Sequence, residues 1–151
     1  MKRVVFFIIL CLFSCKPEKE RTNIPDAPIY FQIRLSNYTV FTGGIGNVLT
    51  CPQDLVSSSD KAGSFGYSGR VLLINDFENR IGAYDACCTS PACVAQKNIV
   101  SAGIRAKCPV CGSEFDLSAG GAVVAGSAQY PLRRYRVTIS GGILAVSRYA
   151  Y

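Results

Sequence analysis

The sequence predicts an all-β fold, and three features of the chain lead to this prediction. From residue 29 onward, short runs rich in β-branched and aromatic residues alternate with turns that contain glycine. Within residues 135–139, polar and apolar side chains alternate, as in a strand with one buried face. No stretch carries the sustained apolar stripe of a helix. Many short strands joined by turns indicate a small sandwich or barrel.

Individual strands can be placed from local patterns. The apolar run at residues 71–75 predicts a buried strand. The run at residues 81–86, after a turn, predicts the next strand, which pairs with it. Gly141 and Gly142 predict a tight hairpin between two further runs, because both glycines accept positive φ. Two short runs lead into and out of a pair of cysteines. The expected strands are residues 71–75, 81–86, 104–107, 114–117, 134–140 and 143–147.

The N-terminus, MKRVVFFIILCLFSC, has the features of an export signal. Lys2 and Arg3 precede an apolar segment, residues 4–13, that is too short to span a bilayer. The segment ends in Ser14-Cys15, which resembles the lipobox of bacterial lipoproteins, where the cysteine after the cut becomes lipidated. Residues 1–14 are therefore predicted to be a signal peptide and Cys15 the lipidated residue. The alternative is an ordinary secreted protein in which Cys15 has no such role.

A charged, proline-rich stretch follows Cys15 and shows no apolar periodicity. Residues 15–28 are expected to be the lipidated N-terminus and a flexible tether, and residues 29–151 a single β domain. The protein is then expected in the cell envelope, anchored by lipid to a bacterial membrane and either periplasmic or surface-exposed. The formal net charge is +6, but no basic run interleaved with aromatic residues occurs. This pattern argues against nucleic acid as a partner.

Six cysteines remain after the N-terminal segment, and four of them have the spacing of metal ligands. Cys108 and Cys111 form a C-x2-C pair on a glycine-bearing turn, so both thiolates can point at one centre. Cys88 and Cys93 form a C-x4-C pair, with Cys87 as a rival to Cys88. Outside the cytoplasm the same cysteines can form disulfides, and six cysteines allow fifteen pairings.

The chain between residues 69 and 147 resembles a Rieske iron–sulfur domain. In that family, one loop reads C-x-H-x-x-C and the other C-P-x-H-G-S. This chain has CTSPAC at 88–93 and CPVCGS at 108–113, followed in order by EFDLSAG, GSA and PLRRYRV. The resemblance implies a Rieske-like fold of three small antiparallel sheets, with the two cysteine-bearing loops side by side at one tip.

The departures from the family pattern concern the ligands themselves. The chain has no histidine, so an ordinary Rieske cluster with two histidine ligands is excluded. Ser90 and Cys111 stand at the two histidine positions, whereas the two cysteine ligands of the family correspond to Cys88 and Cys108. Many family members also have a disulfide between the loops. Cys93 matches its first half, but Val110 stands at the second.

Three interpretations of the cysteines stay open. In the first and principal one, Cys88, Cys93, Cys108 and Cys111 hold a [2Fe-2S] cluster by thiolates alone and the domain transfers single electrons. In the second, the same four thiolates hold Zn²⁺. In the third, no metal binds and disulfides stabilise a structural or interaction module.

Cys51 and Cys87 lie outside the expected set of metal ligands. Cys87 is expected to face away from the site, because neighbouring residues on a strand point to opposite faces, and Cys51 is either its disulfide partner or a buried free thiol. No nucleophile–base pair and no paired-carboxylate spacing occurs, so the chain is not expected to be an enzyme. Its expected partners are the membrane and a redox or envelope protein.

Overall fold

The computed structural model describes residues 22–78, 80–94 and 99–148. The expected signal peptide, Cys15 and the first part of the expected tether lie outside these residues. In the part of the chain that the structure describes, no helix is both long enough and apolar enough to cross a membrane.

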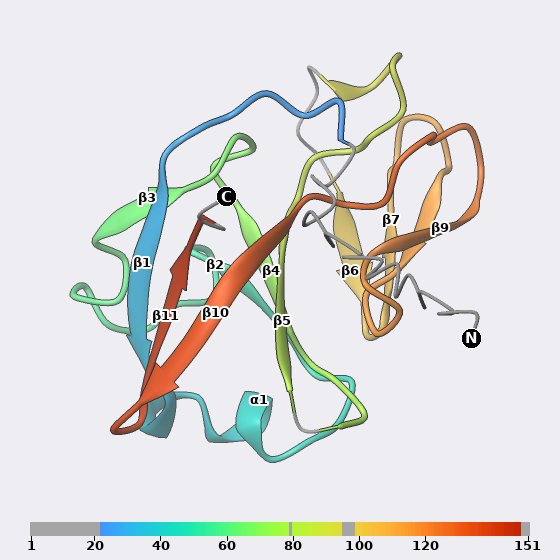
Figure 1. The fold of residues 1–151 in the computed structure, drawn as a ribbon. Helices are drawn as coiled ribbons and strands as arrows, with labels where there is room; N and C mark the ends of the chain where they lie inside the picture. Colours follow the sequence, from blue (N-terminus) through green and yellow to red (C-terminus); the bar gives the residue numbers. More distant parts are fainter. Residues whose placement is uncertain (1–21, 79, 95–98, 149–151) are drawn as a thin grey trace, which may run out of the picture.

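The described chain forms two sheets, and every strand pairing in them is antiparallel (Figure 1). The larger sheet has seven strands in the order β2-β4-β5-β10-β11-β1-β3, and the smaller has four in the order β6-β7-β8-β9. The strands of the larger sheet are β1 (Ile29–Arg34), β2 (Val48–Cys51), β3 (Gly63–Phe65), β4 (Val71–Asn75), β5 (Ile81–Asp85), β10 (Arg134–Ser140) and β11 (Ile143–Ser147). Those of the smaller sheet are β6 (Val100–Ala102), β7 (Arg105–Lys107), β8 (Glu114–Asp116) and β9 (Ala122–Ala125). The predicted all-β class is confirmed.

Strand β10 divides the large sheet into two parts. Its first residues, Arg134 and Tyr135, pair with β5, whereas residues 136–140 pair with β11. One part therefore contains β2, β4 and β5, and the other contains β11, β1 and β3. Together with the smaller sheet, these parts form the three groups of strands that the resemblance implies.

The six expected strands are all present, three of them with the expected bounds and three within one residue of them. Sequence reasoning did not place β1, β2, β3, β6 and β9 individually. It also missed two single turns of helix, η1 (Leu35–Asn37) and α1 (Thr39–Thr42). A single turn is too short to produce a recognisable helical period in the sequence.

Strand β4 lies between two hydrophobic cores and is buried along its whole length. Val71 and Leu73 belong to the first core, which β1 and β11 also line, whereas Leu72 and Ile74 belong to the second. Successive side chains of a strand point to opposite faces, so a strand covered on both faces reads as a continuous apolar run. The second core contains the cysteines discussed below, and β4 is thus one wall of that site.

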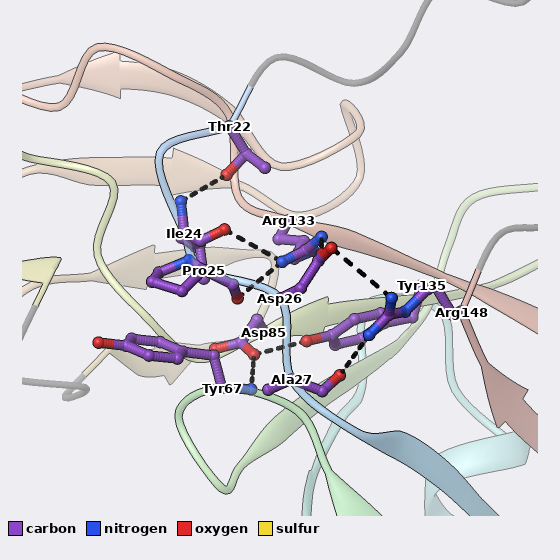
Figure 2. A network of polar contacts seen from close by, with 10 residues as sticks. All are labelled: Thr22, Ile24, Pro25, Asp26, Ala27, Tyr67, Asp85, Arg133, Tyr135 and Arg148. Atoms are coloured by element: carbon purple, nitrogen blue, oxygen red, sulfur yellow. Dashed lines mark hydrogen bonds and ion pairs between the residues drawn. The ribbon is translucent and has the colours of Figure 1, made fainter. Parts of the chain in front are cut away.

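Residues 22–28, the last part of the expected tether, contact the β domain. We call residues 22–28 the strap. Ile24 in the strap is 4% exposed, and the guanidinium of Arg133 donates hydrogen bonds to the carbonyls of Ile24 at 3.0 Å and Pro25 at 2.8 Å (Figure 2). Arg133 also forms an ion pair with Asp26. These contacts span more than a hundred residues, so the composition of the strap could not reveal them.

Arg148 holds the end of the strap in a similar way. It donates a hydrogen bond to the carbonyl of Ala27 at 3.1 Å, and its second nitrogen lies 3.6 Å from a carboxylate oxygen of Asp26 (Figure 2). At the other end, the amide of Asn23 donates to the carbonyl of Thr89 at 2.9 Å. The strap therefore contacts the loop that carries Cys88.

We expect Arg133→Ala to lower the free energy of unfolding by about 2 kcal/mol, because hydrogen bonds from a charged donor contribute about 1.5–3 kcal/mol. The matched control is Arg134→Ala, since Arg134 is exposed on the next position of the chain, and it should change stability by less than about 0.5 kcal/mol. Urea unfolding of the two variants measures the difference. Equal losses would show that Arg133 does not hold the strap.

Candidate metal centre

The first cysteine loop begins directly after β5. Cys88 and Cys93 are both buried in the second core. A turn closes between them, in which the N–H groups of Cys93 and Val94 donate to the carbonyl of Ser90 at 2.8 and 3.2 Å. Cys87 belongs to neither core cluster, and its Sγ lies 3.1 Å from the carbonyl oxygen of Val94.

The second cysteine loop joins β7 to β8. The N–H of Cys108 donates to the carbonyl of Ser113 at 2.8 Å, and the N–H of Gly112 donates to the carbonyl of Cys108 at 2.9 Å. Gly112 has φ +72°, a left-handed conformation that a residue with a side chain rarely adopts. This turn brings Cys108 and Cys111 to the same end of the small sheet, as the C-x2-C spacing predicts.

The structure brings the sulfur atoms of Cys88, Cys93, Cys108 and Cys111 together. All four Sγ atoms lie within 4.8 Å of one another, and those of Cys88 and Cys111 are 3.7 Å apart. The first three residues are at most 1% exposed, whereas Cys111 is half-buried. Four converging sulfurs form the soft donor set that zinc and iron prefer.

The surroundings of the four thiols shift their pKa values in different directions. Burial raises the pKa of Cys88 and raises that of Cys93 to about 11. Burial acts in the same direction on Cys111, but hydrogen bonds from Ser113 and the neighbouring thiols outweigh it and lower the Cys111 pKa to about 6. The thiolate is the form that binds metal, so binding would release protons and become tighter as pH rises.

One short segment contacts both cysteine loops, and we call residues 126–130 the brace. The hydroxyl oxygens of Ser90 and Ser127 lie 3.1 Å apart, and the hydroxyl of Thr89 donates to the carbonyl of Tyr130. On the second loop, the Oγ of Ser113 accepts a hydrogen bond from the N–H of Ala128 at 3.0 Å. The brace thus joins the two loops through hydroxyl groups.

The brace packs so closely against the second loop that no Cβ atom fits at Gly126. A Cβ on Gly126 would lie 2.4 Å from the Cα of Ser113, and Gly126 has φ +91°. Glycine is therefore required there for steric and conformational reasons. In the sequence, GSA at 126–128 is one of the motifs that carry the resemblance, but nothing in this motif indicates that it connects the two loops.

Ser90 stands where the resemblance places a histidine, and the structure gives it two roles. Its hydroxyl contacts Ser127 of the brace, and its backbone N–H donates to the Sγ of Cys88 at 3.4 Å. Ser90 is 2% exposed. These two contacts connect the first loop to the brace and to the Cys88 sulfur.

Of the two alternatives that the sequence left open for Cys51, the structure shows the buried free thiol and not the disulfide with Cys87. Cys51 belongs to the first core and pairs with Val71 across β2 and β4. Cys87 follows β5 and contacts Val94 instead. Sequence spacing alone could not distinguish these environments.

Comparisons with known proteins give two kinds of result. No family model matches the chain, and no curated protein matches it. Among solved structures, it is similar to a complex of reduced oxygenase and oxidized ferredoxin in carbazole 1,9a-dioxygenase, with 14% identity over 80% of this chain and 94% of that chain, and a TM-score of 0.48. It is also similar to the ferredoxin of carbazole 1,9a-dioxygenase from Nocardioides aromaticivorans IC177, with 16% identity over 82% of this chain and 99% of that chain, and a TM-score of 0.43.

Proposed function

We propose that this chain is a Rieske-like iron–sulfur protein in which Cys88, Cys93, Cys108 and Cys111 bind iron. The observation that carries the proposal is the convergence of four sulfur atoms from two separate loops within 4.8 Å. Two further features support it. The motifs from CTSPAC to PLRRYRV follow the order of the Rieske family, and three of the four cysteines are almost fully buried.

The proposed role is the transfer of single electrons to or from a redox protein. Iron held by thiolates supplies a one-electron couple when it is bound. The protein contributes a fixed set of sulfurs, excludes water from Cys88, Cys93 and Cys108, and leaves Cys111 half-buried. An electron carrier needs no general base, and the chain has no histidine. We propose that it is not an enzyme.

The donor type fits the [2Fe-2S] cluster that the resemblance implies, since four cysteines are a known ligand set for that cluster. The spacing of the sulfurs fits less closely. Two irons and their bridging sulfides would stand between thiolates on different irons, so the two loops would have to move apart to accommodate them.

Purification without oxygen, followed by iron analysis and EPR, tests the proposal. The expected result is coloured protein with stoichiometric iron and a one-electron redox change that EPR can follow. Colourless protein without iron would contradict the electron-transfer role.

A second candidate function is a structural or interaction module held together by zinc. The observation that favours it is the burial of the site in the second core between β4 and the small sheet. A closed four-thiolate zinc site contributes directly to folding. Zinc analysis distinguishes this candidate from the first, because such a protein is colourless and shows no EPR signal.

We also propose that the protein is a lipoprotein of the cell envelope, anchored through Cys15. Cys15→Ala is expected to abolish membrane attachment and leave the unprocessed precursor, because the residue that receives lipid is missing. Cys11→Ala is the control, since Cys11 lies in the same segment but before the expected cut. Fractionation of cells and the mass of the mature chain measure both effects. A Cys15→Ala variant that matures and fractionates like the wild type would contradict the anchor.

A further inference from the structure

The geometry points to a centre with one metal ion bound by all four thiolates, in place of the two-iron cluster that the resemblance implies. This inference rests on one part of the proposed function, the binding of a metal by the thiolates of Cys88, Cys93, Cys108 and Cys111. It does not require electron transfer. The evidence is the spacing of the sulfurs and the contacts that fix this spacing.

The sulfur spacing matches one tetrahedral ion. A metal–sulfur distance of about 2.3 Å in a tetrahedron places any two of the four sulfurs about 3.8 Å apart. The Sγ atoms of Cys88 and Cys111 are 3.7 Å apart, and every other pair in the set lies within 4.8 Å. One ion at the centre of this set would need only small adjustments of the side chains.

The same spacing is too short for two irons. In a [2Fe-2S] cluster with four cysteines, two thiolates bind each iron, and sulfurs on different irons are separated by about 5 Å or more. Four of the six sulfur pairs would have to exceed that separation. In this structure none of the six pairs exceeds 4.8 Å.

Contacts outside the sulfurs resist a separation of the loops. The brace is bonded to the first loop through Ser90 and Thr89 and to the second through Ser113. Gly126 also lies so close to Ser113 that no further atom fits between them. If the two loops moved apart, the hydrogen bonds between the loops and the brace would lengthen. Otherwise the brace would have to move away from the end of β9, which directly precedes it in the chain.

Burial supports a closed site rather than one with an open position. Cys88 and Cys108 are fully buried and Cys93 is 1% exposed. Phe115 and Leu117 belong to the same core cluster as these three cysteines. A four-coordinate ion without a water ligand is the form that such a closed set of thiolates favours. Tetrahedral Zn²⁺ and tetrahedral iron share this chemistry, and the experiment below separates them.

The test measures metal and acid-labile sulfide in the full mature chain, purified without oxygen in detergent. Native mass spectrometry of the same sample gives the mass added to the chain. We expect one metal ion per chain and no labile sulfide. Two irons and two sulfides per chain would overturn the inference while leaving the proposed iron–sulfur function intact. One zinc per chain would support the inference and contradict electron transfer.

A second measurement does not depend on the metal that the chain holds when it is isolated. Metal-free, reduced chain is titrated with Co²⁺, whose absorption reports tetrahedral thiolate coordination. We expect saturation at one Co²⁺ per chain, the same stoichiometry in the Cys87→Ser variant, and loss of the tetrahedral spectrum in Cys111→Ser. Saturation at two ions, or no uptake by the reduced chain, would overturn the inference, and absence of uptake would also contradict the proposed function.

Discussion

Cys108→Ser is expected to lose most of its bound metal, whereas Cys87→Ser is expected to keep it. Cys108 is fully buried and its Sγ is one of the four that converge within 4.8 Å. A serine hydroxyl is a poor substitute for a thiolate, and three remaining ligands leave a position that water can enter. Cys111→Ser should have the same effect, because its sulfur lies 3.7 Å from that of Cys88.

Cys87→Ser is the matched control for this prediction. Cys87 is as buried as Cys88 and is its direct neighbour in the chain, but its Sγ lies 3.1 Å from the carbonyl oxygen of Val94. A serine hydroxyl can donate to the same carbonyl, so the fold should tolerate the change. Metal content per folded chain is the measurement. Equal loss from Cys87→Ser and Cys88→Ser would show that the ligand set is wrong.

Asp85→Ala is expected to lower the free energy of unfolding by about 3–5 kcal/mol, because one buried and two part-buried donors would lose their acceptor. Asp85 is fully buried at the end of β5. Its carboxylate accepts a hydrogen bond from the hydroxyl of Tyr135 at 2.6 Å and from the backbone N–H of Tyr67 at 2.8 Å (Figure 2). It also accepts a hydrogen bond from the backbone N–H of Ser68 at 3.2 Å. These contacts join β5, β10 and the turn after β3.

Tyr135→Phe separates one of these contacts from the others. Burial and the carboxylate of Asp85 raise the pKa of the Tyr135 hydroxyl, so it remains a proton donor at neutral pH. The phenylalanine variant removes that donor but leaves both backbone donors in place. It should cost less than Asp85→Ala, about 1.5–3 kcal/mol. Urea unfolding measures both variants, and a loss below about 1 kcal/mol for Asp85→Ala would contradict a structural role for the carboxylate.

Much of the fold could be predicted from the sequence because its causes are local. The apolar run at 71–75 gave a buried strand, and Gly141 and Gly142 gave the hairpin between β10 and β11. Alternation along a strand and positive φ at a turn depend on neighbouring residues only. The C-x2-C spacing likewise placed Cys108 and Cys111 on one turn.

The strap and the brace could not be predicted in this way. Residues 22–28 have the composition of a solvated linker, but Arg133 and Arg148, more than a hundred residues later, donate to their carbonyls. In the brace, Ser127 and Ala128 are small residues that carry no pattern of their own. Their role appears only when hydrogen bonds connect them to the two cysteine loops.

By itself, the sequence determined the all-β class, the two cysteine pairs, and the exclusion of a histidine-ligated cluster, because these depend on composition and short-range pattern. Only the tertiary structure decided that the four sulfurs meet within 4.8 Å and that Cys87 lies 3.1 Å from a backbone carbonyl instead. The physical reason is that the distance between two loops is set by the packing of β4, the small sheet and the brace around a shared core. Contacts between residues far apart in the chain fix that packing. The spacing of the cysteines along the sequence does not predict these contacts.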